Sequence, residues 1–319
     1  MDKEKRLELI KRNTAEIVTE PELIELLKEK KKPVAYCGYE PNGPLHLGHL
    51  VTITKLQDLE EAGCSVKILL ADIHALLNRK GEEHEIEQEV KNWKKTIKAL
   101  GIKAEIVLGS SFQFKKEYQF EVMKLAQHTT INRGLRSMQE IARDIDNATI
   151  SQLWYPLMQV ADIKLMGVDI AVGGMEQRKV HMIGKDESAT LKHSFLAIHT
   201  PLIVSLKGPG KKMSKSIPGS AIALTDSTEE IKKAVAEAYC PMKEINDNPI
   251  LQIARFIIFP RINVLKIERP AKFGGNLSFS SYTELEDSYK EGKLHPADLK
   301  NAVAIELEKI IAPIRKKIE

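Results

Sequence analysis

Two histidines lie three residues apart in a turn rich in proline, asparagine and glycine, Glu40-Pro-Asn-Gly-Pro-Leu-His46-Leu-Gly48-His49. The apolar run 33–36 before this turn predicts a buried strand, and apolar residues at helical spacing follow it. A strand, a tight turn and a helix start together bring backbone N–H groups to a phosphate. His46 and His49 can then face one bound anion, while Gly48 lets a flat base approach the backbone. A pair of surface or capping histidines would give the same short pattern.

A second group of residues suited to phosphate chemistry lies far downstream, in the run Lys211-Lys212-Met213-Ser214-Lys215-Ser216. Glycine and proline flank it on both sides, which predicts a loop. Two lysines on such a loop can neutralise negative charge on a phosphate group. Taken alone, the run is also explained by a solvated basic loop. Both groups in one chain, in this order, are hard to reach by chance.

A third group contains an aromatic, an amide and a carboxylate side chain. Tyr155, Gln159 and Asp162 fall at positions i, i+4 and i+7, which form one stripe of a helix. Such a stripe is unusual for a core-facing side and suits a polar pocket. Gly173-Gly174 follows the next predicted strand and lets a ligand approach the backbone. These residues predict a site for a small ligand that carries both polar and apolar groups.

The elements that must position these groups alternate between strands and helices. Apolar runs predict strands at 33–36, 66–71, 104–108 and 168–172, and a charged amphipathic pattern predicts a helix over 82–99. This order predicts an α/β fold with a doubly wound parallel sheet, which binds ligands at the carboxyl ends of its strands. Asp72 and His74 follow a strand and can line the same crevice, although a capping carboxylate and a packed histidine are the simpler interpretation.

The sequence patterns in the rest of the chain predict mostly helices. Residues 1–32 predict two short helices, and 113–150 predict a polar helical region whose arginines fit a solvated helix face. Residues 221–319 predict a mostly helical second domain, whose first helix starts at Ser227 or Thr228. We therefore expect three parts: an N-terminal helical segment at 1–32, an α/β domain at 33–220 with a helical insertion near 113–150, and a helical domain at 221–319.

Composition is that of a soluble protein. The chain has 319 residues, a net charge of +4 and 43% hydrophobic residues, which allows two domains and a sizeable core. Its three cysteines are widely spaced, so neither a disulfide framework nor a zinc site is indicated. No cluster of carboxylates suggests a protein-built metal site. The charged N-terminus and the lack of a long apolar run predict a cytoplasmic protein without a membrane span.

Together the histidine motif and the lysine loop resemble the two ATP-binding motifs of class I aminoacyl-tRNA synthetases, His-Ile-Gly-His and Lys-Met-Ser-Lys-Ser. The first differs only by Leu47, and the second matches fully. The resemblance implies a Rossmann-like catalytic domain and catalytic roles for His46, His49, Lys212 and Lys215. It also implies ATP contacts from Gly48, Gly173, Glu176, Met213, Ser214 and Ser216.

The resemblance is narrower over residues 151–181, whose run Gly-Gly-Met-Glu-Gln-Arg-Lys is similar to that of archaeal and eukaryotic-type tyrosyl-tRNA synthetases. It implies that L-tyrosine is bound by Tyr36, Tyr155, Gln159, Asp162 and Gln177. Tyr36 and Asp162 would bond the phenol hydroxyl, and the other three would hold the α-amino end. The resemblance further implies tRNA contacts from Arg136, Arg178, Lys179, Phe273 and Asp298, the last two in an anticodon-binding domain.

The implied reaction has two steps. Tyrosine's carboxylate attacks the α-phosphate of ATP, and the tyrosyl group then passes to the 3′ end of tRNA(Tyr). Mg²⁺ is expected to arrive with ATP, and the lysine loop to close over ATP only when it is bound. The resemblance also implies a homodimer, because family members of this size are usually homodimers.

Three alternatives remain open from the sequence. A tryptophanyl-tRNA synthetase shares both ATP motifs, but indole offers only one N–H donor and cannot use a donation from Tyr36. Small nucleotidylyltransferases share the histidine motif and lack the lysine loop and the helical domain. A non-enzymatic RNA-binding or signalling paralogue would be expected to have lost motif residues, and here both motifs are intact.

Overall fold

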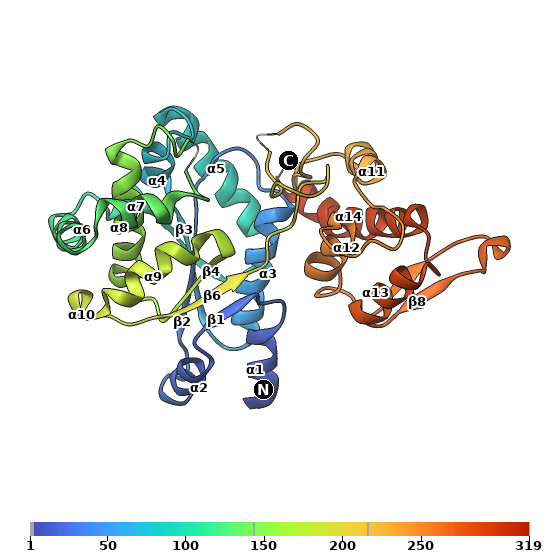
Figure 1. Ribbon diagram of the computed structural model, residues 1–319, viewed down its shortest axis with the longest axis horizontal. Coiled ribbons are helices and arrows are strands. Elements are labelled where there is room, and N and C mark those ends of the chain that lie inside the picture. Colours follow the sequence, from blue (N-terminus) through green and yellow to red (C-terminus); the bar gives the residue numbers. More distant parts are fainter. Residues whose placement is uncertain (1–2, 143, 216, 319) are drawn as a thin grey trace. The chain divides into compact units, whose positions relative to one another are not determined.

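The computed structural model describes residues 3–142, 144–215 and 217–318 (Figure 1). The chain forms two compact units. The first contains the residues up to Asn42, Lys55–Lys94 and Gly101–Pro201, and the second contains Gly43–Thr54, Lys95–Leu100 and the chain from Leu202 onward. None of the described helices is both long enough and apolar enough to span a membrane.

A six-stranded sheet forms the centre of the first unit, in the order β1-β6-β5-β2-β3-β4. All neighbouring pairs are parallel except β1 and β6, which are antiparallel. The strands are β1 (Glu16–Val18), β2 (Val34–Tyr39), β3 (Ser65–Leu70), β4 (Ala104–Leu108), β5 (Ile170–Gly174) and β6 (Leu196–Thr200). The order of the strands reverses between β2 and β5, which is where a doubly wound sheet binds its ligands. The predicted fold class is confirmed.

Helices cover this sheet and supply the side chains of the site. They are α1 (Lys3–Lys11), α2 (Glu20–Glu29), α3 (Leu47–Glu61), α4 (Asp72–Leu77), α5 (Glu83–Ala99), α6 (Lys116–His128), α7 (Ile131–Met138), α8 (Ile150–Leu165), α9 (Arg178–Asp186) and α10 (Ser188–Leu191), with short 3-10 turns η1 (Gly109–Ser111) and η2 (Met175–Gln177). Helices α6, α7 and α9 pack against α8 (Figure 1). Buried Tyr118, Leu157, Val160 and Ile183 are part of the apolar core that joins them.

In the first unit the structure differs from the predicted elements in several places. The short strand β1 was predicted as part of a helical segment, and β6 was not predicted at all. Strand β5 starts at Ile170 rather than 168, and the polar region 113–150 has a break between α7 and α8. Strand β1 spans only three residues and is stabilised by its partner on β6, so its own sequence carries little strand signal.

The second unit is mostly helical. It contains α11 (Thr228–Glu237), α12 (Pro249–Ile253) continued by a π-helical turn η3 (Ala254–Ile258), α13 (Tyr282–Glu291) and α14 (Pro296–Ile318). Helix α11 packs along α14 (Figure 1). The helix starts where the sequence predicts, and Ser227 caps α11 in a capping box with Glu230. A two-stranded hairpin of β7 (Leu265–Ile267) and β8 (Leu277–Phe279), which the sequence analysis missed, carries the 3-10 turn η4 (Ala271–Phe273) between its strands.

Candidate active site

The predicted polar stripe lies on α8. Tyr155, Gln159 and Asp162 all fall within this one helix, and all three are buried. Thr149 precedes the helix, and its N–H donates to Gln152 Oε1 at 3.0 Å. Packing against α6, α7 and α9 holds the three side chains in fixed positions. The structure therefore places the three residues on one helix face, as predicted.

The two oxygens of the Asp162 carboxylate have different surroundings. Oδ1 accepts a hydrogen bond from Gln113 Nε2 at 2.8 Å and another from the Tyr118 hydroxyl at 2.8 Å. Oδ2 is buried and has no hydrogen-bond partner in the part of the chain that the structure describes. Burial raises the pKa of Asp162 to about 7, although the two hydrogen bonds act in the opposite direction. Oδ2 is thus a buried acceptor that a ligand can fill.

His74 lies beside this acceptor. Its Nδ1 lies 3.4 Å from Gln113 Nε2, which donates to it, so the neutral ring carries its proton on Nε2. Burial lowers the pKa of His74 to about 3, which keeps the ring neutral. Nε2 is 3.5 Å from Asp162 Oδ2 and forms no hydrogen bond with any described residue. A buried donor and a buried acceptor, unpaired and side by side, suit a hydroxyl group, which can accept from one and donate to the other.

His74 is packed, as the sequence predicts, with its ring edge-on to Tyr155 at 4.6 Å. Asp72 is a capping carboxylate, as predicted, but it caps η1 through the Ser110 N–H (2.9 Å) rather than its own helix. Sequence reasoning missed Gln113 and Tyr118 altogether. No short motif could have found them, because they reach Asp162 from elements far away along the chain.

Tyr36 lies on β2 and is 1% exposed. Burial raises the pKa of its phenol well above the ordinary value, and the negative charge of Asp162 raises it further. The hydroxyl therefore keeps its proton and remains a donor at neutral pH. A Cβ at Gly38 would lie 2.7 Å from the Tyr36 hydroxyl oxygen, so glycine at this position makes room for the ring.

Gln159 and Gln177 meet at the other predicted end of the pocket, where Gln159 Nε2 donates to Gln177 Oε1 at 3.1 Å. A Cβ at Gly173 would lie 2.7 Å from Gln177 Cβ and 3.2 Å from the ring of His181. The absence of a side chain at Gly173 thus leaves room for the side chain of Gln177. Glu176 Oε2, in η2, is buried without a hydrogen-bond partner among the described residues, which leaves an acceptor for the predicted contact with ATP.

The histidine motif lies in the second unit. The Gly48 N–H donates to His46 Nδ1 at 3.1 Å, and the His46 N–H donates to His49 Nδ1 at 3.3 Å. The ring centroids are 3.8 Å apart. Burial lowers the pKa of His46 to about 4, with further lowering by Lys215 and Lys212. Burial also lowers the pKa of His49 well below its ordinary value. Both rings are therefore neutral, and because Nδ1 of each ring accepts a hydrogen bond, each ring carries its proton on Nε2.

The lysine loop lies beside this motif within the same unit. A Cβ at Gly48 would lie 2.9 Å from the His46 ring and 3.8 Å from the carbonyl oxygen of Met213. Backbone hydrogen bonds hold Met213 N–H to Ile203 O (2.9 Å), and Ser214 N–H binds the Ser220 hydroxyl (3.1 Å). Lys212 is exposed, and Lys215 pairs with Asp226. Ser216 lies outside the described residues.

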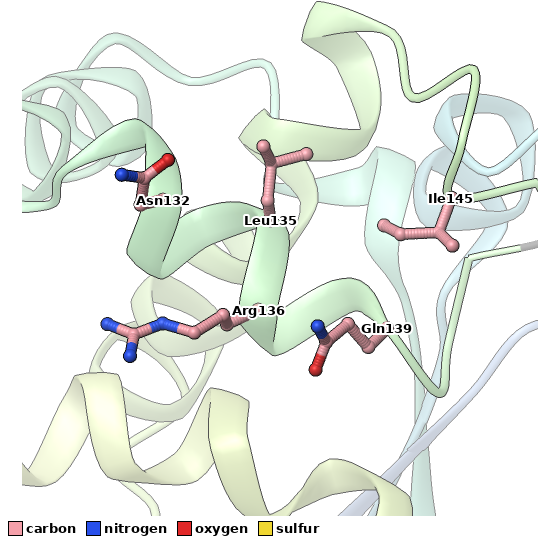
Figure 2. A pocket seen from close by; sticks show the side chains of 5 residues that line it. All are labelled: Asn132, Leu135, Arg136, Gln139 and Ile145. Atoms are coloured by element: carbon pink, nitrogen blue, oxygen red, sulfur yellow. The ribbon is translucent and has the colours of Figure 1, made fainter.

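Three residues that were predicted to bind RNA lie in the first unit, and the first of them is Arg136. It is exposed on α7 and lines a hollow of about 460 Å³ with Asn132, Leu135, Gln139 and Ile145 (Figure 2). Lys179 is exposed and donates to Gln139 Oε1 at 2.9 Å. Arg178 instead forms a two-pronged ion pair with Glu16, at 2.7 and 2.9 Å. Part of its hydrogen-bonding capacity is therefore used within the protein.

The two residues predicted to read the anticodon lie in the second unit. Phe273 ends η4 and is 58% exposed, with Lys272 Nζ 5.0 Å from its ring centroid. The next residue, Gly274, has φ +94°, a conformation that favours glycine. Asp298 lies in the first turn of α14, 3.9 Å from Arg269. The described residues contain no group of three or more His, Cys, Asp or Glu side chains that could hold a metal ion.

The first unit contains a doubly wound sheet, and the second unit contains a pair of histidines with a lysine loop beside it. A family model described as tRNA synthetases class I (W and Y) matches residues 28–312. The chain belongs to this family.

Relatives from archaea match the chain over its whole length. The tyrosine–tRNA ligase of Archaeoglobus fulgidus is 46% identical and covers 100% of this chain and 99% of its own length. That of Methanocaldococcus jannaschii is 49% identical, with 98% and 99% covered. The crystal structure of the Archaeoglobus fulgidus tyrosyl-tRNA synthetase complexed with L-tyrosine is similar with a TM-score of 0.96 over 100% of both chains.

Proposed function

We propose that this protein is a tyrosine–tRNA ligase, which activates L-tyrosine with ATP and transfers the tyrosyl group to tRNA(Tyr). The observation that carries the choice of tyrosine is the unpaired acceptor Asp162 Oδ2 beside the unpaired donor His74 Nε2–H. A phenol hydroxyl satisfies both groups. An indole N–H satisfies only the acceptor and leaves a buried donor unpaired, which costs about 1–3 kcal/mol. This cost argues against tryptophan as the substrate.

The amino-acid pocket holds the substrate at both ends. Asp162 accepts the phenol proton, and Tyr36 and His74 donate to the phenol oxygen. Gln159, Gln177 and Tyr155 hold the α-amino end, because their amide and hydroxyl oxygens accept hydrogen bonds from an ammonium group.

Activation needs no protein nucleophile, because the tyrosine carboxylate itself attacks the α-phosphate of ATP. Neutral His46 and His49 donate hydrogen bonds to the phosphates, and Lys212 and Lys215 neutralise the charge that grows on departing pyrophosphate. Positioning and charge stabilisation therefore supply the rate enhancement. Mg²⁺ enters with ATP. Gly48, Met213, Ser214, Ser216, Gly173 and Glu176 complete the ATP contacts.

The second step uses tRNA(Tyr). We assign residues 33–220 to catalysis and 221–319 to binding the anticodon, with the acceptor end held by Arg136, Arg178 and Lys179. The protein acts in the cytoplasm as a homodimer. Phe273 offers an exposed ring on which a base can stack, and Asp298 can accept from an exposed base edge.

ATP–pyrophosphate exchange with tyrosine and tryptophan in parallel tests the amino-acid assignment. We expect exchange that depends on tyrosine and is negligible with tryptophan. Exchange that depends on tryptophan, or no exchange with either amino acid, would refute the proposal.

The RNA assignment predicts a separation of the two steps. Asp298→Ala should impair aminoacylation of tRNA(Tyr) and leave tyrosine-dependent pyrophosphate exchange nearly unchanged, because only the first assay requires the anticodon contact. Both assays are run on the same preparation, with Asp287→Ala, a carboxylate removed from α13, as the control. An equal loss in both assays would mean that Asp298 supports the fold and does not read RNA.

A further inference from the structure

Asp226 holds the second lysine of the lysine loop. Lys215 Nζ lies 3.1 Å from Asp226 Oδ1 and 3.3 Å from Oδ2, so the ammonium group spans both carboxylate oxygens. The lysine side chain is 34% exposed and the aspartate side chain 19%. A pair this close to solvent contributes little to stability. The ion pair therefore matters because it fixes the position of the Lys215 side chain.

The same carboxylate is tied to the backbone that carries the histidine motif. Asp226 Oδ2 accepts a hydrogen bond from the Ala223 N–H at 2.8 Å. Ala223 in turn forms an antiparallel bridge with His46, and the Leu224 N–H donates to Leu45 O at 2.8 Å. Asp226 thus connects Lys215 on one side to the strand-like segment beside His46 on the other.

Other contacts fix Asp226 itself. Arg315 on α14 donates to the Asp226 backbone carbonyl at 2.5 Å. The neighbouring carboxylate of Glu230 accepts from the Ser227 N–H at 2.8 Å in the capping box of α11. Asp226 is therefore a negatively charged group that is held in place beside Lys215.

We propose that Asp226 is a positioning residue for adenylate formation, which acts by holding the Lys215 side chain on the segment that pairs with His46. This inference rests on the proposed function of the loop. An ammonium group has three N–H donors, and one carboxylate occupies at most two of them. At least one donor remains for an oxygen of the departing pyrophosphate. Lysine has four rotatable bonds, so prior ordering by Asp226 removes an entropic cost from the transition state.

Asp226→Asn separates this role from a structural one. Asparagine keeps an oxygen that can accept from the Ala223 N–H and removes the charge that holds Lys215. We expect the rate constant of adenylate formation to fall about tenfold to a hundredfold, with tyrosine affinity unchanged. Thermal unfolding should stay close to that of the unmodified protein. Glu229→Gln is the matched control, because Glu229 is exposed in the first turn of α11 and its loss removes the same charge.

A double-mutant cycle with Lys215→Ala decides whether Asp226 acts through the lysine. In the Lys215→Ala background, Asp226→Asn should cause no further loss. A loss of the same size in both backgrounds would show that Asp226 acts on the fold or on another group, which overturns the proposal. Faster adenylate formation in Asp226→Asn would show that the carboxylate competes with the substrate for Lys215, and would also overturn it. Full activity of Lys215→Ala alone would overturn the role of the loop itself.

Discussion

Asp162→Ala should abolish most of the preference for tyrosine over phenylalanine. The substitution removes the acceptor of the phenol proton and also leaves Gln113 Nε2 without its acceptor at 2.8 Å, whereas the Tyr118 hydroxyl can still donate to Met158 O at 2.9 Å. Loss of a charge-assisted hydrogen bond together with an unpaired buried partner costs about 2–4 kcal/mol in the specificity constant for tyrosine. Phenylalanine should lose much less, because it never formed the bond.

Kinetics of pyrophosphate exchange with both amino acids on this one variant measure the effect. Phenylalanine serves as the internal control for general damage to the pocket. Asp162→Asn keeps the shape and an acceptor oxygen, so it should fall between the alanine variant and the unmodified protein. An unchanged ratio of tyrosine to phenylalanine would mean that Asp162 is not in contact with the phenol.

Lys215→Ala should slow adenylate formation about a hundredfold to a thousandfold, the usual loss when one group that stabilises developing charge is removed. The negative charge that this lysine meets grows only as pyrophosphate departs, so the substitution should affect the transition state far more than the bound ground state. Tyrosine affinity should hardly change, since none of the proposed tyrosine contacts comes from the loop.

Single-turnover formation of tyrosyl-adenylate gives the rate, and equilibrium titration gives the tyrosine affinity. Lys211→Ala is the matched control, because it removes the same charge from the same exposed loop immediately before the motif. If tyrosine affinity and activation rate fell by the same factor, Lys215 would belong to the amino-acid pocket and its assignment to pyrophosphate would be wrong.

Local patterns predicted the parts of the fold that depend on local sequence. The α/β class and the stripe of Tyr155, Gln159 and Asp162 follow from helical and strand periodicity, which neighbouring residues determine. The start of α11 directly after Ser227 follows from a capping residue with Glu229 and Glu230 in the first turn. In each of these cases the residues that carry the sequence pattern are close together in the chain and belong to the element that they predict.

The features that the sequence did not reveal depend on contacts between residues that are far apart in the chain. Strand β1 exists because Glu16, Ile17 and Val18 pair with β6, and their register partners are about 180 residues away. The environment of Asp162 depends on Gln113 after η1, Tyr118 on α6 and His74 on α4. Which oxygen of Asp162 remains unpaired follows from how these three elements pack around α8, and no spacing within the chain encodes it.

Charging of tRNA with labelled amino acids tests the central claim most directly. Transcripts of tRNA(Tyr) and tRNA(Trp) are each offered tyrosine and tryptophan in separate reactions. A tyrosine–tRNA ligase esterifies tyrosine to tRNA(Tyr) and leaves the other three combinations uncharged. Tryptophan esterified to tRNA(Trp), or adenylate formed without transfer to either RNA, would contradict the account.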